Sequence, residues 1–277
     1  MLMFDAATTS ALGERLGVAW RWAPSKEPGV VTNNAAHVMV ERGRASSVEA
    51  AHAAIRQALD ETTPGALELA AFDEGLLSVD VAVRPEWCTH LRADFAPLNA
   101  AATRWQSVQP DVHIDGATMT FAAAAERIGL DALTWALLDA AHPKRTPVPV
   151  AAPESVLASR RDANTLALVR RAHSVASLAV AGVGAGEEAG TAAGTSADGA
   201  GRRLLAALAL VPQAAEDAVR TGRTRPLLTQ IVILAERTTQ FAEHSPATRT
   251  DLPVFDAARR VLEGALTAAR LAAPVPY

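Results

Sequence analysis

The sequence predicts a small α+β domain at the N-terminal end of the chain, followed by an all-α helical bundle. The chain has 277 residues, of which 49% are hydrophobic, and this length is typical of two globular domains. Residues 76–83 alternate apolar and polar side chains, as a half-buried strand does. Beyond residue 118 apolar residues recur mainly at helical spacing. We therefore expect one domain over 1–92 and a second over 118–277.

The first domain is expected to contain at least one helix and one strand. Ser46 and Ser47 can cap a helix over 48–59, in which these residues share an apolar face: Val48, Ala51, Ile55 and Leu59. The strand over 76–83 carries its apolar residues at alternate positions, namely Leu77, Val79, Val81 and Val83. A compact α+β unit explains both patterns.

Residues 93–117 are expected to be a linker, because Pro97, Pro110 and Gly116 interrupt them and no period is sustained. Pro212 is expected to break or kink one of the helices that follow. The low-complexity stretch 182–201 predicts a mobile loop between two of them. The helices are predicted over 118–128, 131–141, 162–180, 201–220, 225–243 and 253–272.

Charge and composition limit the classes of function. The net charge of -4 argues against strong non-specific binding of nucleic acid, but residues 1–130 carry -6 and residues 131–277 carry +2. No apolar run approaches the roughly 20 residues of a membrane span, and no secretory signal is recognisable, so we expect a cytoplasmic protein. The single cysteine, Cys88, excludes an intramolecular disulfide and a multi-cysteine metal site.

Three short motifs suggest chemistry, and each has a simpler explanation. Cys88 and His90 bring a thiol near an imidazole, but residues so close in sequence rarely form a nucleophile and its base. Glu49 and His52 lack a third metal ligand. The glycines of 182–190 follow a helical pattern rather than a strand, which favours a loop over a phosphate-binding motif. We predict no catalytic residue, no metal and no cofactor, and we keep Cys88 chemistry as a remote alternative.

The stretch GLDALTWALLDAAH at 129–142 resembles the start of the anticodon-binding helical domain of class I arginyl-tRNA synthetases. Asp131, Ala132 and Leu133 match the family's Asp-Ala-Leu-Arg signature, in which Thr134 here replaces the arginine. Downstream, RRDANTLALVRRAHSV matches a second family pattern at these positions: Asn164, Val169, Ala172 and His173. The later segments PLLTQIVILAERTTQFAEH and AARRVLEGALTAARLAAPVPY resemble the family's last two helices.

The N-terminal part has a weaker resemblance to the appended N-terminal domain of the same synthetases, with matches at Gly29, Asn34 and Gly75. Between the two matched regions a synthetase carries its Rossmann catalytic domain, whereas only about 25 residues are available here, far fewer than one nucleotide-binding domain. No lysine lies between residues 27 and 143 to match the family's catalytic loop. The resemblance therefore implies a relative that does not aminoacylate.

The resemblance also bears on RNA binding. The family's tyrosines fall here on Ala167, Leu168 and Arg171, so the aromatic platform for bases is largely lost. Asn164 is expected to be a helix cap or a buried hydrogen-bonding residue, and His173 a core histidine. Candidate RNA contacts are the arginines near two helix starts and the C-terminal tyrosine: Arg160, Arg161, Arg170, Arg171, Arg220, Arg223, Arg225 and Tyr277.

Two functions from different classes follow. The first is binding of tRNA or another structured RNA without chemistry, by a stand-alone relative of arginyl-tRNA synthetase. The second is a protein-interaction or regulatory module that has lost RNA binding and acts as a homodimer or as the partner of an enzyme that uses aminoacyl-tRNA. The second predicts an apolar surface patch, whereas the first depends on the arginines.

Overall fold

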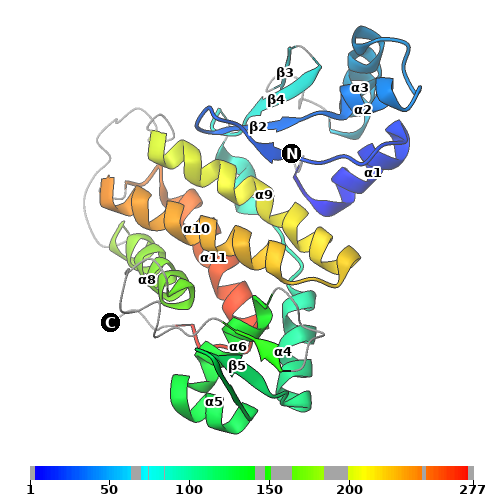
Figure 1. The fold of residues 1–277 in the computed structure, drawn as a ribbon. Helices are drawn as coiled ribbons and strands as arrows, with labels where there is room; N and C mark the ends of the chain where they lie inside the picture. The colour runs from blue at the N-terminus through cyan, green and yellow to red at the C-terminus, as the bar shows by residue number, and fades with distance from the viewer. Residues whose placement is uncertain are drawn as a thin grey trace.

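A computed structural model describes residues 4–63, 70–73, 75–83, 85–140, 147–150, 164–183, 199–244 and 248–273 (Figure 1). The N-terminal unit has an antiparallel sheet in the order β1-β2-β4-β3, accompanied by three α-helices. A 3-10 helix, η2 (Pro85–His90), follows this unit. The elements of the N-terminal unit are α1 (Ala6–Leu16), β1 (Ala23–Pro24), β2 (Val30–Asn33), α2 (Ala35–Glu41), α3 (Val48–Thr62), β3 (Ala70–Asp73) and β4 (Leu76–Asp80).

The predicted helix and strand of this unit are both confirmed. The Ser47 hydroxyl accepts a hydrogen bond from the Ala50 N–H at 3.2 Å and so caps α3, whose apolar face is buried. Leu77 and Val79 of β4 are also buried. The strand ends earlier than predicted, because the Asp80 carboxylate accepts a hydrogen bond from the Ala82 N–H and turns the chain.

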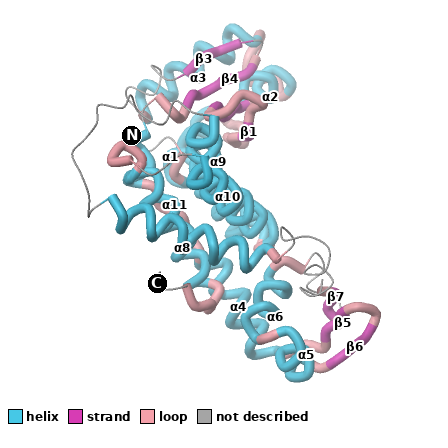
Figure 2. The backbone as a smooth tube through the Cα atoms, turned by 90° about the vertical axis from the view of Figure 1, so that its left-hand side faces the viewer, coloured by secondary structure: helices cyan, strands magenta, loops and turns pink. Residues whose placement is uncertain are grey.

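Within the described residues, the C-terminal bundle contains four long helices, which lie side by side in Figures 1 and 2. Helix α10 packs against α8 and α9, while α11 packs against α8. The rings of Phe241 and Phe255 stack between α10 and α11, with centroids 5.0 Å apart. The helices are α8 (Thr165–Val183), α9 (Gly199–Thr221), α10 (Arg225–His244) and α11 (Leu252–Ala268).

The sequence made two predictions about interruptions of the bundle helices, one at Pro212 and one over 182–201. Pro212 does not break its helix, because α9 continues through it and buries apolar residues on both sides, including Leu208 and Ala215. This packing offsets the cost of a proline inside a helix, roughly 3 kcal/mol. Most of the predicted loop over 182–201 lies outside the described residues, and both of its described ends are helical.

The expectation of a linker over 93–117 is wrong for its local structure. This segment contains α4 (Ala96–Val108) and β5 (Val112–Ile114), and β6 (Ala117–Met119) begins at its end. Strand β5 also pairs in parallel with β7 (Val148–Pro149), so the second half of the chain is not purely helical. Helix α5 (Phe121–Ile128) starts only after β6, and α6 (Leu130–Leu138) follows it.

The N-terminal unit is fixed to α9 by polar contacts. The Gln213 side chain accepts a hydrogen bond from the backbone N–H of Trp22 at 2.5 Å and donates one to its carbonyl at 2.9 Å. Arg202 donates to the Pro28 carbonyl and to the Asp80 carboxylate, at 3.0 and 2.6 Å. Helix α9 therefore joins the N-terminal sheet to the bundle (Figure 2). Among the described residues, no helix is both long and apolar enough to cross a bilayer.

Candidate nucleic-acid interface

The predicted arginines do not form one continuous patch. Arg170 and Arg171 lie on α8, whereas Arg220, Arg223 and Arg225 surround the turn between α9 and α10. Arg171 pairs with Glu243 at the end of α10, whose axis carries that residue roughly 27 Å from Arg225 at its start. Arg160, Arg161 and Tyr277 lie outside the described residues.

The α8 arginines are engaged in contacts within the protein. Arg170 forms an ion pair with Asp131, the first residue of the synthetase-like signature. Arg171 forms an ion pair with Glu243 at 3.0 Å, in which both side chains are exposed. Beside them the Trp135 indole N–H donates to the Thr165 hydroxyl at 2.9 Å, which further fixes α6 to the start of α8. The charge of each of these two arginines is thus partly neutralised by a carboxylate.

The other residues of the synthetase-like motifs cap a helix or lie wholly or partly buried. Asn164 caps α8, because its side-chain oxygen accepts a hydrogen bond from the Ala167 N–H at 3.0 Å. Leu133 is fully buried on α6, and Ala132 is half-buried beside it. His173 is buried on α8, in the position expected of a core histidine. The Asp131–Arg170 ion pair and the Trp135–Thr165 hydrogen bond thus connect the signature on α6 to the start of α8.

The arginines of the α9–α10 turn differ in their contacts. Arg220 pairs with Asp217 at 2.9 Å, and Asp217 also holds Arg21 of the N-terminal unit. Arg225 approaches the Asp139 carboxylate only to 3.8 Å. Arg223 is exposed and forms no ion pair within the described part of the chain. Arg223 is therefore the candidate of this group whose charge is most available to a ligand.

A cleft of about 1180 Å³ opens between α4, the C-terminal end of α6 and the α9–α10 turn. Arg223 and Arg225 line its turn side, and Arg104 of α4 lines it from another element. The Thr224 hydroxyl donates to the Leu138 carbonyl at 2.6 Å, which fixes the turn to α6. We name this feature the α4–α10 cleft. Sequence reasoning missed Arg104, because the segment that carries it was expected to be a linker.

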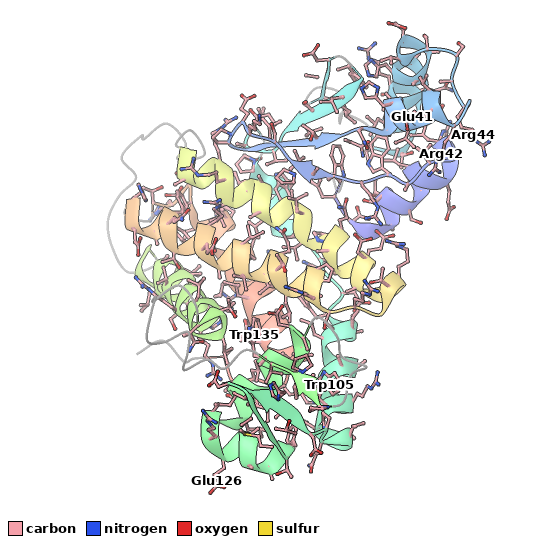
Figure 3. All side chains as sticks on the ribbon, in the orientation of Figure 1. Glu41, Arg42, Arg44, Trp105, Glu126 and Trp135 are labelled. Atoms are coloured by element: carbon pink, nitrogen blue, oxygen red, sulfur yellow. The ribbon has the colours of Figure 1, made fainter. Side chains whose placement is uncertain are left out.

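Arg104 is oriented by its neighbour Trp105. The guanidinium carbon lies 5.5 Å from the centroid of the indole ring, within the range of a cation–π contact. Trp105 is only 5% exposed, so burial fixes the ring. Figure 3 labels Trp105 on α4 and Trp135 on α6, both between the long helices of the bundle and α5. Arg104 is itself exposed, and no ion pair with a described carboxylate engages it.

The cleft is cationic although the chain is acidic. Its lining has three arginines and one acidic residue, Asp94, whereas the whole chain has a net charge of -4. Close by, burial raises the pKa of the Asp139 carboxyl, although Arg225 acts in the opposite direction. Between the charged groups the lining is mainly alanine, leucine and valine, including Ala101 and Val219. Such a cleft can attract an anion at its rim and bury apolar surface on its floor.

The comparisons with known proteins give little further information. No family model matches the chain, and no curated protein matches it. Among solved structures, a protein from Campylobacter jejuni described as a "putative arginyl t-RNA synthetase" is similar, with 15% sequence identity and a TM-score of 0.44. The similarity covers 60% of this chain and 39% of that protein.

The other motifs of the sequence do not build a reactive site within the described residues. The Cys88 thiol is buried and donates to the Pro253 carbonyl at 3.4 Å, and burial raises its pKa to about 12. It is therefore a protonated thiol at neutral pH, which is a poor nucleophile. The His52 ring packs edge-on against Phe72, with centroids 5.0 Å apart. No group of three metal-ligating side chains occurs in the described ranges, and most of the glycine-rich run lies outside them.

Proposed function

We propose that the chain is a non-catalytic RNA-binding protein related to arginyl-tRNA synthetases, which holds tRNA or another structured RNA through the α4–α10 cleft. The observation that carries the proposal is a cationic cleft on an acidic chain, lined by Arg104, Arg223 and Arg225. The synthetase-like segments at 129–142 and 164–173 support RNA rather than another polyanion.

The physical basis is the contact between guanidinium groups and phosphates. Arginine donates several hydrogen bonds in a planar fork and keeps its charge at all relevant pH values. Each phosphate that it neutralises releases counterions, which gives affinity without reading the base sequence. Because the rest of the chain is acidic, binding is expected to be confined to the cleft and to weaken steeply with salt.

The absence of chemistry is also a proposal, based on the space between the two synthetase-like regions. The intervening residues form α4 and part of a hairpin, which together are much smaller than a nucleotide-binding domain. We therefore expect neither ATP binding nor aminoacylation, and no cofactor requirement.

The direct test is a titration of labelled total tRNA with the intact protein and with the double variant Arg223→Glu and Arg225→Glu. We expect charge reversal at the turn to abolish binding. The double variant Arg42→Glu and Arg44→Glu is the matched control, since it changes the net charge equally and both residues are exposed on the N-terminal unit, away from α4 (Figure 3). The proposal fails if the native protein binds tRNA no better than a neutral protein does, or if the turn variant binds as well as the control.

A second candidate function, a protein-interaction module, is favoured by the apolar floor of the same cleft. Val219 is 56% exposed there, and the exposed Ala100 and Pro226 line the same cleft. A second copy of the chain or an acidic amphipathic helix of a partner is expected to bury this floor. Light scattering that gives a monomer at every concentration, together with a pulldown in which Val219→Asp loses no partner, excludes this candidate.

A further inference from the structure

We infer that the α4–α10 cleft takes an unpaired nucleotide, with its base stacked on the guanidinium plane of Arg104 and its flanking phosphates at Arg223 and Arg225. This inference rests on the proposed RNA binding and specifies which part of an RNA the cleft recognises. Helix α4 lies outside the segments that resemble the synthetases, so the resemblance assigns no role to Arg104.

The position of Arg104 is the first argument. Pro97, Ala101 and Arg104 lie at helical spacing on one face of α4, and all three line the cleft. The guanidinium lies over the Trp105 ring, which keeps the long side chain from sampling all its rotamers. Arg104 remains exposed and lines the cleft beside this contact, so its guanidinium is accessible to a ligand there. An oriented planar cation loses less conformational entropy when it binds a ring.

The second argument is the chemistry of the other cleft residues. Proteins that bind unpaired bases stack them on aromatic rings or on guanidinium planes. The aromatic residue in the described lining of the cleft is Trp105, which is too buried to take a base itself. On the α4 side of the cleft, Arg104 is therefore the planar group that remains for stacking. The small side chains of Ala100 and Ala101, on the same helix as Arg104, also line the cleft and are not fully buried.

The third argument is that the cleft carries cations on two different elements, one for the base and one for the phosphates. Arg104 belongs to α4, whereas Arg223 and Arg225 belong to the turn that Thr224 fixes to α6. Because all three arginines line one cleft, a base on Arg104 is expected to have its sugar and phosphates near the turn arginines. A continuous duplex keeps its bases stacked inside and offers only phosphates, so it can use the turn arginines but not the plane of Arg104. The cleft is accordingly expected to prefer loops, bulges or ends to duplex.

The test compares two RNA probes, a hairpin with an unpaired loop and a fully paired duplex of the same length. Arg104→Lys keeps the positive charge but removes the plane, and Arg223→Lys is its matched control on the turn. We expect Arg104→Lys to weaken hairpin binding roughly tenfold while duplex binding changes little. Arg223→Lys is expected to change both affinities by less than about threefold, since lysine still neutralises a phosphate.

The outcomes separate this inference from the proposed function. If Arg104→Lys binds the hairpin as the native protein does, while Arg223→Glu weakens both probes, the cleft binds RNA but the stacking role of Arg104 is wrong. The stacking role is also wrong if Arg104→Lys and Arg223→Lys weaken both probes equally. If the native protein binds neither probe, the proposed function itself fails. A thermal unfolding curve for each variant establishes that it is folded.

Discussion

Replacing Arg223 by glutamine is expected to change how RNA binding depends on salt. For single-stranded nucleic acid, the logarithm of the binding constant falls with the logarithm of salt concentration, with a slope of roughly 0.7 for each phosphate neutralised. Three arginines line the α4–α10 cleft, so the native protein is expected to show a slope of about 2. Removal of Arg223 is expected to reduce the slope to about 1.4.

These slopes correspond to measurable changes in affinity. Between 50 and 200 mM salt the native protein is expected to lose roughly 18-fold in affinity, and the Arg223→Gln variant roughly sevenfold. Arg223 is a suitable position because it is exposed and has no ion-pair partner within the described ranges, so its removal leaves no carboxylate unpaired. Glutamine also retains part of the side-chain volume.

The assay is fluorescence anisotropy of a labelled hairpin RNA at four salt concentrations. Arg42→Gln is measured in parallel, since Arg42 lies far from the cleft and its removal is expected to leave the slope unchanged. An unchanged slope for Arg223→Gln refutes the assignment of a phosphate contact to this residue. A similar fall in slope for both variants refutes the assignment of RNA to the cleft, because it indicates that only net charge matters.

Three further predictions concern stability. Gln213→Ala removes two half-buried hydrogen bonds to the N-terminal unit and is expected to lower the free energy of unfolding by about 1–3 kcal/mol in urea titrations; no change contradicts the role of this contact. Gly29→Ala is expected to destabilise more than Gly43→Ala, because both glycines have a positive φ but only at Gly29 does an added Cβ meet the Arg202 Cβ of α9, at 2.9 Å. Equal urea midpoints contradict this reasoning. Burial raises the pKa of the Cys88 thiol to about 12 in the folded protein, whereas the unfolded pKa is roughly 8.5. The thiol therefore contributes its full stabilisation below about pH 8.5, and this stabilisation is lost as the pH rises from there toward 12. Cys88→Ala is expected to make the free energy of unfolding less dependent on pH in that window.

Local patterns were sufficient to predict the elements with strong periodicity. The helix after Ser47 and the alternating residues of β4 need only neighbours in the sequence, because a cap and an apolar face specify each element. The long helices of the bundle were predicted for the same reason. Their ends differ by only a few residues from the predicted limits, as at Arg225–His244 for 225–243.

The segment 93–117 was missed because its signals are short and its helix is rich in alanine. Helix α4 has only three buried positions, Leu98, Ala102 and Trp105, although Asp94 accepts a hydrogen bond from the Ala96 N–H near its start. The hairpin had a recognisable signal in Asp115–Gly116. Both residues have positive φ, 50° and 81°, in the two-residue turn that joins β5 to β6, and Asp-Gly is a preferred sequence there.

The candidate site was harder to predict, because the availability of a cation depends on partners distant in sequence. Arg170 and Asp131 are 39 residues apart, and Arg171 and Glu243 are 72 apart. No local pattern reveals such pairs. A cluster of arginines in a sequence therefore does not by itself indicate a cationic surface.

The same reasoning explains why Arg104 is a better candidate than the arginines that the sequence emphasised. On α8, an anionic ligand has to compete with carboxylates that already partly neutralise Arg170 and Arg171. Arg104 instead lies over a ring, so a ligand that approaches it displaces no described carboxylate. Its position opposite the turn also exists only once α4 has packed against α6 and α9. The property that favours binding is thus created by tertiary packing, and it is at α4, outside the synthetase-like segments, that mutations are expected to separate recognition of an unpaired base from simple attraction to phosphate.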